Sequence, residues 1–324
     1  MSTGGITDVP GVRVGHRTLV HGDIRTGVTA IVPHDGDVYR DRPVAASYVL
    51  NGFGKTVGLM QIDELGEIET PILLTNTFSV GTCANALIRR AIAANPGIGR
   101  NGPTVNPVVG ECNDGYLNDI QAMAVTEADA CAALDDASLQ FARGAVGAGA
   151  GMSCFGFKGG IGSASRAITL DGQGFQLGVL ALCNFGRAGD LRLKCGERIA
   201  PPAESGPERG SVILVVATDV PLDHRQLRRV IRRGGVGLAR VGSVWGNGSG
   251  DVCIGFTTAN RTPLVARSDL LALRMIAEPR IDLLFQAMAG ATEDAVKDAL
   301  LSAETTIGRD GHMRRGLRGV LEGS

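Results

Sequence analysis

Three segments of the chain are short, rich in β-branched and apolar residues, and bounded by Gly, Pro or Asp. They are Phe175 to Leu182, Ser211 to Thr218 and Val252 to Thr258. These features predict β-strands. Because the segments are almost continuously apolar and do not alternate with polar residues, we expect them in a sheet that is covered on both faces.

Further strands and several helices are predicted around these segments. The strands are expected at Thr26 to Val32, Pro71 to Leu74 and Pro107 to Gly110. The helices are expected at Thr82 to Ala94, Glu127 to Ala142, Asp223 to Arg233 and Asp282 to Ala303. Thr126 and Asp129 have the spacing of a capping box at the start of the second helix. This pattern predicts a layered α/β or α+β fold.

The composition favours a tightly turned enzyme. The chain has 324 residues, 44% of them hydrophobic, so it can bury a sizeable core in one large domain or two small ones. It has 47 glycines and only 4% aromatic residues, so Val, Ile, Leu and Ala must build the interior. The polar stretch 194–210 predicts an exposed loop, and the Arg- and Gly-rich tail after Thr306 is expected to be loosely ordered.

The charge balance argues against nucleic acid as a partner, since 32 basic and 33 acidic side chains give a net charge of −1. One dense basic cluster recurs at helical spacing without aromatic residues for base stacking, and we interpret it as a solvated helix face. It consists of Arg225, Arg228, Arg229, Arg232 and Arg233. No stretch reaches the roughly 18 apolar residues of a membrane span, and residues 1–10 lack the pattern of a signal peptide. We therefore expect a cytoplasmic protein without a membrane partner.

The cysteines and histidines predict no metal site. Seven cysteines are scattered without a Cys-x-x-Cys pair and are interpreted as reduced thiols, most of them small core residues. The five histidines have no ligand spacing, and none lies in a glycine-rich segment. The same pattern argues against a catalytic triad that depends on histidine.

The glycine-rich stretch 144–162, GAVGAGAGMSCFGFKGGIG, is a candidate for close backbone approach to a ligand. Consecutive glycines expose N–H groups that can bind an oxyanion or a carboxylate, which makes Gly149 and Gly151 candidate substrate-binding residues. A packing role is the alternative. The stretch also holds Lys158, one of four lysines in an Arg-dominated chain, and a lysine among glycines in an apolar run is a candidate functional residue.

Two motifs depart from the patterns that they suggest. Residues 51–56, NGFGKT, end like a phosphate-binding loop, but Val49 stands where that motif needs its first glycine. Residues 246–251, GNGSGD, resemble a nucleophile elbow without matching GxSxG. There we expect a turn in which Ser249 and Asp251 are buried and hydrogen-bonded.

Two single residues have a functional and a structural interpretation. Asn184 ends the apolar run in LALCNFG and is either a strand-end turn former or a side-chain amide donor. Tyr116 lies in GECNDGYLND and is either a site residue or a surface tyrosine in a turn.

The junction of Gly210 and Ser211 is the most informative point. Ser211 follows the polar loop and begins the buried strand SVILVVATD, so cleavage of this bond would make it an N-terminal nucleophile. The new α-amine, with an unperturbed pKa of about 8, can then act as the general base that histidine otherwise supplies. Glycine leaves the carbonyl open to attack and tolerates backbone strain. This chemistry accounts for the missing histidine.

Six segments in the same order resemble the family of L-aminopeptidase/D-Ala-esterase/amidases and β-peptidyl aminopeptidases, which is distantly similar to the nylon-oligomer hydrolases. They are GITDVPGVRVGH (5–16), VVGECNDGYLND (108–119), GAGAGMSCFGFKGGIGSASR (147–166), GVLALCNFG (178–186), GSVILVVATDVPL (210–222) and GNGSGDVCIGFTTAN (246–260). Ordered matches over nearly the whole chain are far more specific than any single motif.

The resemblance implies a four-layer αββα sandwich of the α+β class, similar to the N-terminal-nucleophile hydrolases but with different connectivity. It implies a precursor of one domain that cuts itself between Gly210 and Ser211 into an α chain, 1–210, and a β chain, 211–324. Such proteins commonly assemble as homotetramers of αβ units.

By motif position, the resemblance implies that Ser211 is the nucleophile and Asn184 an oxyanion donor. Ser249 and Asp251 are implied to support the Ser211 amine and hydroxyl. Relatives often carry Glu at the position of Asp251, and the aspartate side chain is shorter by one methylene group. Because the loop before Ser211 varies in the family, substrate preference does not transfer.

The resemblance also implies that Tyr116 and Lys158 line the site. A substrate with a free amino terminus needs an anionic subsite, for which Asp251 and Glu111 are candidates. The expected partner is a small peptide, amide or ester, with no metal and no cofactor. Two alternatives stay open: acyl transfer to an amine, as in the similar ornithine acetyltransferases, whose nucleophile is usually Thr, and a scaffold that binds a small ligand without turnover.

Overall fold

A five-stranded sheet with the order β3-β13-β12-β9-β8 lies at the centre of the computed structural model, which describes residues 4–193, 198–199 and 209–322. Its strands are β3 (Asp41–Gly52), β8 (Gly160–Leu170), β9 (Gln173–Asn184), β12 (Arg209–Thr218) and β13 (Gly248–Pro263). β12 and β13 run parallel, and the other neighbours run antiparallel. The three almost continuously apolar segments are β9, β12 and β13, the inner strands of this sheet.

A four-stranded sheet with the order β1-β2-β4-β5 packs against one face of the central sheet. Its strands are β1 (Arg13–His21), β2 (Ile24–Val32), β4 (Ile72–Asn76) and β5 (Val108–Cys112). Alternate residues of β12 face the two sides of the central sheet: Ile213 and Val215 lie in the core between the sheets, whereas Val212 and Leu214 lie in the core beneath the helices. A strand that is covered on both faces is apolar at every position.

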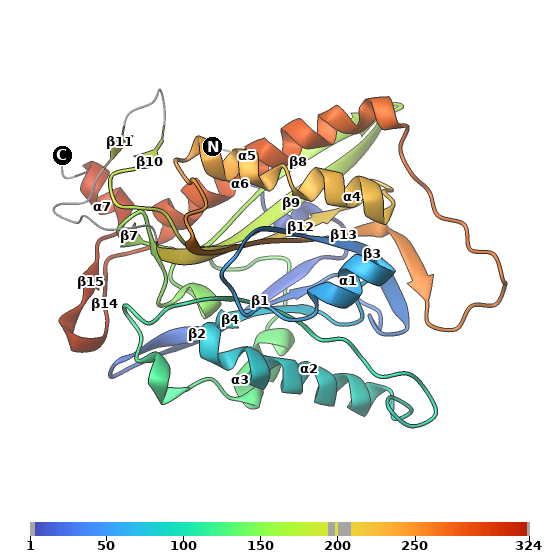
Figure 1. Ribbon diagram of the computed structural model, residues 1–324, viewed down its shortest axis with the longest axis horizontal. Helices are drawn as coiled ribbons and strands as arrows, with labels where there is room; N and C mark the ends of the chain where they lie inside the picture. Colours follow the sequence, from blue (N-terminus) through green and yellow to red (C-terminus); the bar gives the residue numbers. More distant parts are fainter. Residues whose placement is uncertain (1–3, 194–197, 200–208, 323–324) are drawn as a thin grey trace.

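Helices cover the outer faces of both sheets and complete the predicted αββα sandwich (Figure 1). α4 (His224–Ile231), α5 (Gly234–Arg240) and α6 (Ile281–Ser302) pack on the central sheet. α2 (Val80–Ala94) and α3 (Glu127–Asp135) pack on the four-stranded sheet. The shorter elements are α1 (Leu59–Leu65), β6 (Ser153–Cys154), β7 (Phe157–Lys158), β10 (Leu191–Arg192), β11 (Arg198–Ile199), β14 (Thr306–Ile307), β15 (Met313–Arg314) and α7 (Leu317–Glu322).

The predicted strands and helices are present, with one helix shorter than expected. The capping box of Thr126 and Asp129 begins α3, but this helix ends at Asp135 and not at Ala142. The backbone of Ser138 exchanges two hydrogen bonds of 3.0 Å with Val14 of β1, which pulls the chain out of the helix. Most of the exposed loop predicted at 194–210 lies outside the described residues.

The described part of the tail, up to Glu322, forms two paired strands and a helix, so the prediction of a loose tail was wrong. β14 and β15 pair with each other, and polar contacts anchor them to the loop after β5. The Arg309 guanidinium donates to the Gly115 carbonyl at 2.8 Å, and the His312 ring bonds to the Tyr116 carbonyl at 2.9 Å. Hydrogen bonds hold the β14–β15 hairpin, and Leu317 of the following helix is buried in the core.

The arginine cluster of α4 and its C-terminal end is packed and paired. The Arg225 guanidinium makes two contacts of 3.0 and 3.1 Å with the Glu278 carboxylate. The Arg233 guanidinium lies 3.7 Å from the centre of the Phe285 ring. The cluster is therefore a helix face, as expected, whose cations stack on aromatic rings supplied by other elements.

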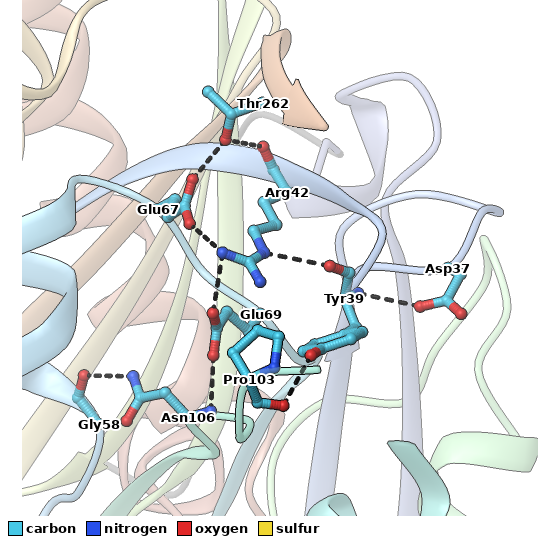
Figure 2. Close-up of polar contacts among 9 residues, drawn as sticks. All are labelled: Asp37, Tyr39, Arg42, Gly58, Glu67, Glu69, Pro103, Asn106 and Thr262. Carbon is cyan, nitrogen blue, oxygen red and sulfur yellow. Dashed lines mark hydrogen bonds and ion pairs between the residues drawn. The ribbon is translucent and has the colours of Figure 1, made fainter. Parts of the chain in front are cut away.

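A buried polar network ties the start of β3 to the end of β13 and to the segments that follow α1 and α2 (Figure 2). Arg42 Nη1 lies 2.5 Å from Glu67 Oε1 and 3.0 Å from Glu69 Oε1, and these side chains are only 4 to 13% exposed. Glu69 also accepts the Asn106 N–H at 2.7 Å. Removal of one member of such a network leaves a charge buried without its partner.

Candidate active site

Ser211 is almost fully buried near the start of β12, between β9 and β13. It lies opposite Asn184 of β9 and opposite Gly250 of β13. The Gly250 N–H donates to Ser211 Oγ at 3.2 Å. A Cβ atom on residue 250 would lie only 3.0 Å from Ser211 Oγ and 2.6 Å from the Phe53 carbonyl oxygen, so glycine is required here. The serine hydroxyl is therefore held by a backbone donor of the neighbouring strand.

The Gly210–Ser211 bond adopts a conformation that only glycine tolerates. Gly210 has a φ of +138°, in the region that side chains disfavour. Gly210 itself carries no side chain that could shield its carbonyl from the serine hydroxyl. The geometry is thus compatible with intramolecular attack at this bond.

The amide of Asn184 has a defined orientation. Its Oδ1 accepts the Ser153 N–H at 2.8 Å, which fixes Nδ2 as the other end of the amide. Nδ2 donates to the Asn113 carbonyl at 2.8 Å and carries a second N–H that can serve an oxyanion next to Ser211. The side-chain amide thus links the backbones of Ser153 and Asn113. A residue that only forms a turn at a strand end would not need these two contacts.

Ser249 and Asp251 are fully buried on β13, beside Ser211. Ser249 Oγ donates to Asp251 Oδ1 at 2.6 Å. The Ser249 N–H donates to the Gly246 carbonyl at 2.9 Å, so the predicted turn with a buried, hydrogen-bonded pair is confirmed. The pair lies one residue to either side of Gly250.

Glu111 lies at the end of β5 with only 2% of its surface exposed. The Lys55 N–H donates to its Oε1 at 2.8 Å, and the Thr77 hydroxyl donates to its Oε2. A Cβ atom on Gly54 would lie 3.5 Å from Glu111 Oε1 and 3.7 Å from the Gly250 Cα. Only the width of Gly54 therefore separates the carboxylate from the strand that holds the Ser211 hydroxyl.

The loop that contains NGFGKT belongs to this site, which the sequence did not reveal. The Asn51 amide donates to the carbonyl groups of Gly246 and Ser249. Phe53 is 60% exposed, and Lys55 Nζ lies 4.6 Å from the centre of its ring. The two glycines of the motif hinted at this close packing, but a phosphate-binding loop was the only role considered for them.

Tyr116 is partly exposed and lies in the loop after β5. Its ring stacks on His312, with the ring centres 4.7 Å apart, and the Arg314 guanidinium lies 3.7 Å from its centre on the ring face. Arg314 Nε donates to Ser153 Oγ at 3.2 Å. The structure therefore connects Tyr116 to Ser153 and Asn184 through the C-terminal hairpin.

Lys158 does not line an open site. Its side chain is fully buried, and Nζ donates to the carbonyl groups of Gly149, Met152 and Gly159 at 2.9, 3.0 and 2.8 Å. Burial lowers the pKa of Lys158 to about 7, while the nearby charge of Asp114 raises it. The expectation of a site-lining lysine is corrected, because the amine faces backbone oxygens behind the glycine-rich stretch.

Gly149 and Gly151 pack closely against other backbone segments, and their role in substrate binding stays a prediction. Both are buried, and the Gly149 N–H donates to the Val146 carbonyl at 2.8 Å. A Cβ atom on Gly149 would lie 2.7 Å from the Gly144 carbonyl oxygen, and one on Gly151 would lie 2.2 Å from that of Arg25. These glycines allow close approach of other backbone segments.

Cys112 lies next to Ser211, where its thiol donates to the Ser211 carbonyl at 3.3 Å. Burial raises the pKa of this thiol well above its usual value, so it stays protonated and is no competing nucleophile. Among the described residues, no group of His, Cys, Asp and Glu could hold a metal ion. No helix in that part of the chain is long and apolar enough to cross a bilayer.

Known proteins match this chain over almost its whole length. A β-peptidyl aminopeptidase, BapA of Sphingosinicella microcystinivorans, is 36% identical over 336 residues, which cover 95% of this chain and 83% of the relative. The PH0078 protein of Pyrococcus horikoshii OT3 has a similar structure, with a TM-score of 0.91 and 43% identity over 98% of this chain and 92% of the other.

The L-aminopeptidase D-Ala-esterase/amidase of Ochrobactrum anthropi, described as a serine aminopeptidase with a variant of the Ntn hydrolase fold, is also similar. Its TM-score is 0.89, with 34% identity over 98% of this chain and 93% of that one. The sequence profile of peptidase family S58 matches residues 4–314. On the strength of these matches, which include every segment of the site around Ser211, the chain belongs to peptidase family S58.

Proposed function

We propose that this chain is a self-processing serine aminopeptidase or amidase whose nucleophile is Ser211, with its own α-amine as the base. The chain is a hydrolase of the aminopeptidase kind, in keeping with its family. The position of Ser211 carries the finer proposal. Its hydroxyl accepts the Gly250 N–H, and Asn184 is its partner on the neighbouring strand, at the start of one buried strand. Acyl transfer needs such a nucleophile beside oxyanion donors.

Self-cleavage begins with attack of the Ser211 hydroxyl oxygen on the carbonyl carbon of Gly210. The hydroxyl proton passes to the peptide nitrogen as the C–N bond breaks, which leaves an ester and a free α-amine. Water then hydrolyses the ester, forms the Gly210 carboxylate and restores the hydroxyl. The chains 1–210 and 211–324 stay in one domain, because β12 remains paired with β9 and β13.

In the mature enzyme, the Ser211 amine accepts the hydroxyl proton as Oγ attacks the substrate carbonyl. The Asn184 Nδ2 and the Gly250 N–H donate to the oxyanion that forms. Ser249 and Asp251, which flank Gly250 on the neighbouring strand and hydrogen-bond to each other, support the Ser211 amine. The leaving amine or alcohol takes up the proton, and water hydrolyses the acyl-enzyme by the same route.

Glu111 binds the free amino group of the substrate. Two hydrogen bonds orient its carboxylate, and Gly54 leaves the space between it and Gly250 narrow. The substrates are therefore small peptides, amides or esters that begin with an amino group. Names of relatives, β-peptidyl aminopeptidase and L-aminopeptidase D-Ala-esterase/amidase, support this class.

A cytoplasmic homotetramer of αβ units is part of the same proposal. The segment 265–275 projects from the body (orange in Figure 1) and exposes apolar side chains that a second copy can cover. They are Val265, Leu270, Leu271, Leu273 and Met275. Six cysteines of the described residues are free thiols, which fits a reducing compartment.

Intact-mass spectrometry of the purified chain and of Ser211→Ala tests the proposal. Two fragments that meet at Gly210 and Ser211 are expected for the native chain, and one intact chain for the variant, whose alanine has no oxygen to accept the acyl group. Ser268→Ala, in the exposed segment, is the matched control and should mature normally. Cleavage of Ser211→Ala at the same bond would refute the nucleophile. Product that forms only with an amine acceptor would indicate a transferase, and ligand binding without turnover a scaffold.

A further inference from the structure

A continuous chain of hydrogen bonds runs from the buried amine of Lys158 to the amide of Asn184. Lys158 Nζ donates to the Met152 carbonyl at 3.0 Å, and the Ser153 N–H donates to Asn184 Oδ1 at 2.8 Å. The Met152 carbonyl and the Ser153 N–H are the two ends of one peptide group. Two amide groups therefore stand head to tail between the lysine and Asn184 Nδ2.

We propose that Lys158 is a positioning residue whose positive charge polarises Asn184 through the Met152–Ser153 peptide group and so strengthens the donor that meets the oxyanion. This inference rests on the proposed function, because it assigns Lys158 a part in the same acyl transfer. Lys158 would then act in catalysis although its buried amine contacts only backbone carbonyl groups.

The physical basis is the polarisation of linked amides. In a trans peptide group the C=O and N–H bonds point in opposite directions, so a cation at the oxygen draws electrons away from the N–H. That N–H then donates more strongly to Asn184 Oδ1, which in turn makes Nδ2–H a stronger donor. Hydrogen bonds arranged in this way strengthen one another, and the effect is larger where water is excluded.

The surroundings of Lys158 indicate that its charge, and not its bulk, is what the fold uses. Three carbonyl acceptors match the three N–H donors of an ammonium group. Burial opposes the charge and lowers the pKa of Lys158, so the fold keeps an ammonium group here against the cost of burying it. A cation kept in such a place is better explained by its effect on the peptide group that it contacts.

The same contacts hold the polarised peptide group in place. The Met152 carbonyl also accepts the Gly159 N–H at 2.9 Å, and the Lys158 N–H donates to the Arg315 carbonyl at 2.8 Å. The short hairpin of β6 and β7 is thereby closed around Ser153. Lys158 thus both polarises and positions the peptide group that donates to Asn184.

A double-mutant cycle of Lys158→Met and Asn184→Ala tests the inference. The turnover number, kcat, is measured on a small amide with a free amino group and divided by the fraction of chains that mass spectrometry shows to be matured. Lys158→Met should lower kcat about tenfold with little change in KM, because an oxyanion donor acts in the transition state. In the Asn184→Ala background the same change should have no further effect, because the charge acts only through that amide.

Thr18→Val is the matched control, since the Thr18 hydroxyl accepts the Gly147 N–H at 2.7 Å in the same glycine-rich stretch without contacting the Met152–Ser153 peptide group. It should leave kcat unchanged. If Lys158→Met does not fold, Ser153→Pro removes the N–H that joins the two amides and should give the same loss and the same lack of additivity. Equal losses in both backgrounds, or native kcat in either variant, would overturn the inference. A native chain that neither matures nor hydrolyses the amide would instead refute the proposed function.

Discussion

The carbonyl oxygen of Asn184 occupies the place that a Cβ atom on residue 210 would need, since the two would be only 1.8 Å apart. The backbones of β9 and β12 thus touch at the bond that we propose is cut. Because Gly210 also has a positive φ, both space and backbone conformation exclude a side chain there.

Gly210→Ala should therefore destabilise the precursor and slow its maturation. In the Ser211→Ala background, where no cleavage occurs, we expect the free energy of unfolding to fall by at least about 1–3 kcal/mol, the range for a strained backbone. Urea unfolding measures this. Gly172→Ala is the control, since Gly172 has a φ of +76° but no atom within 4 Å of an added Cβ. An equal loss in both variants would show that the contact with Asn184 is unimportant.

Asn184→Ala should lower kcat by about 100-fold or more if its amide meets the oxyanion. It also leaves the Ser153 N–H and the Asn113 carbonyl without their partner, so stability should fall by about 1–3 kcal/mol. Steady-state kinetics of matured protein, together with thermal unfolding, separates the two effects. Near-native turnover with reduced stability would support the structural interpretation of Asn184.

Glu111→Gln keeps the shape of the side chain but removes its charge. If the carboxylate binds the substrate amine, kcat/KM for amides with a free amino group should fall by about 10- to 100-fold, the size of a lost charge-assisted hydrogen bond. An ester that lacks the amino group should be hydrolysed at an unchanged rate. A parallel loss on both substrates would contradict an amine-binding role.

Stability should depend on pH through Lys158. Burial lowers its pKa to about 7 in the native chain, whereas an unfolded lysine keeps its proton to about pH 10. Between these values the unfolded chain binds one proton more, so the free energy of unfolding should rise with pH. Two groups lie close enough for their charge to act on Lys158, Asp114 and Cys154. Burial raises the pKa of Asp114 to about 6, so Asp114 titrates below this pH window.

Urea unfolding at pH 7 and 9 of Ser211→Ala, with and without Lys158→Met, measures this dependence. The rise should disappear in the Lys158→Met chain. A rise of the same size in both chains would assign it to other groups.

Arg42→Met should destabilise the fold without changing the chemistry. It leaves the carboxylates of Glu67 and Glu69 buried beside each other, and loss of one partner from a buried ion pair costs about 3–5 kcal/mol. Arg90→Met breaks the exposed contact with Asp135 and should cost less than about 1 kcal/mol. Thermal unfolding compares the two, and kcat of the matured protein should stay native in both.

The sequence predicts the elements whose local pattern and tertiary role agree. β9, β12 and β13 are apolar at nearly every position because both faces are covered, so their hydropathy alone places them in the centre of a sheet. β1, β3 and β8 were missed. β1 is polar on one side, β3 begins with two charged residues and a proline, and β8 is rich in Gly and Ser, so none of them resembles a buried strand.

Contacts between distant segments explain what the sequence could not show. Gly250 and Gly54 look like turn glycines, and only the pairing of β13 with β12 and β3 shows that they stand beside Ser211 and Glu111. Lys158 was found through its unusual setting, but the direction of its amine depends on three backbone carbonyls that no local pattern specifies. The roles of Ser211, Asn184, Ser249 and Asp251 stay predictions until the variants are measured.

The chain end that the proposed maturation would create lies inside a sheet. Chain termini ordinarily fray, and a substrate that binds beside a frayed end must first restrict its motion. Here β12 is paired on both sides from Ser211 onward, so an amine freed by the proposed cleavage would arise between neighbours that already fix its backbone. Breaking one peptide bond would thus give a terminal amino group the rigidity of an internal residue, and little entropy would remain to be lost when the reaction begins.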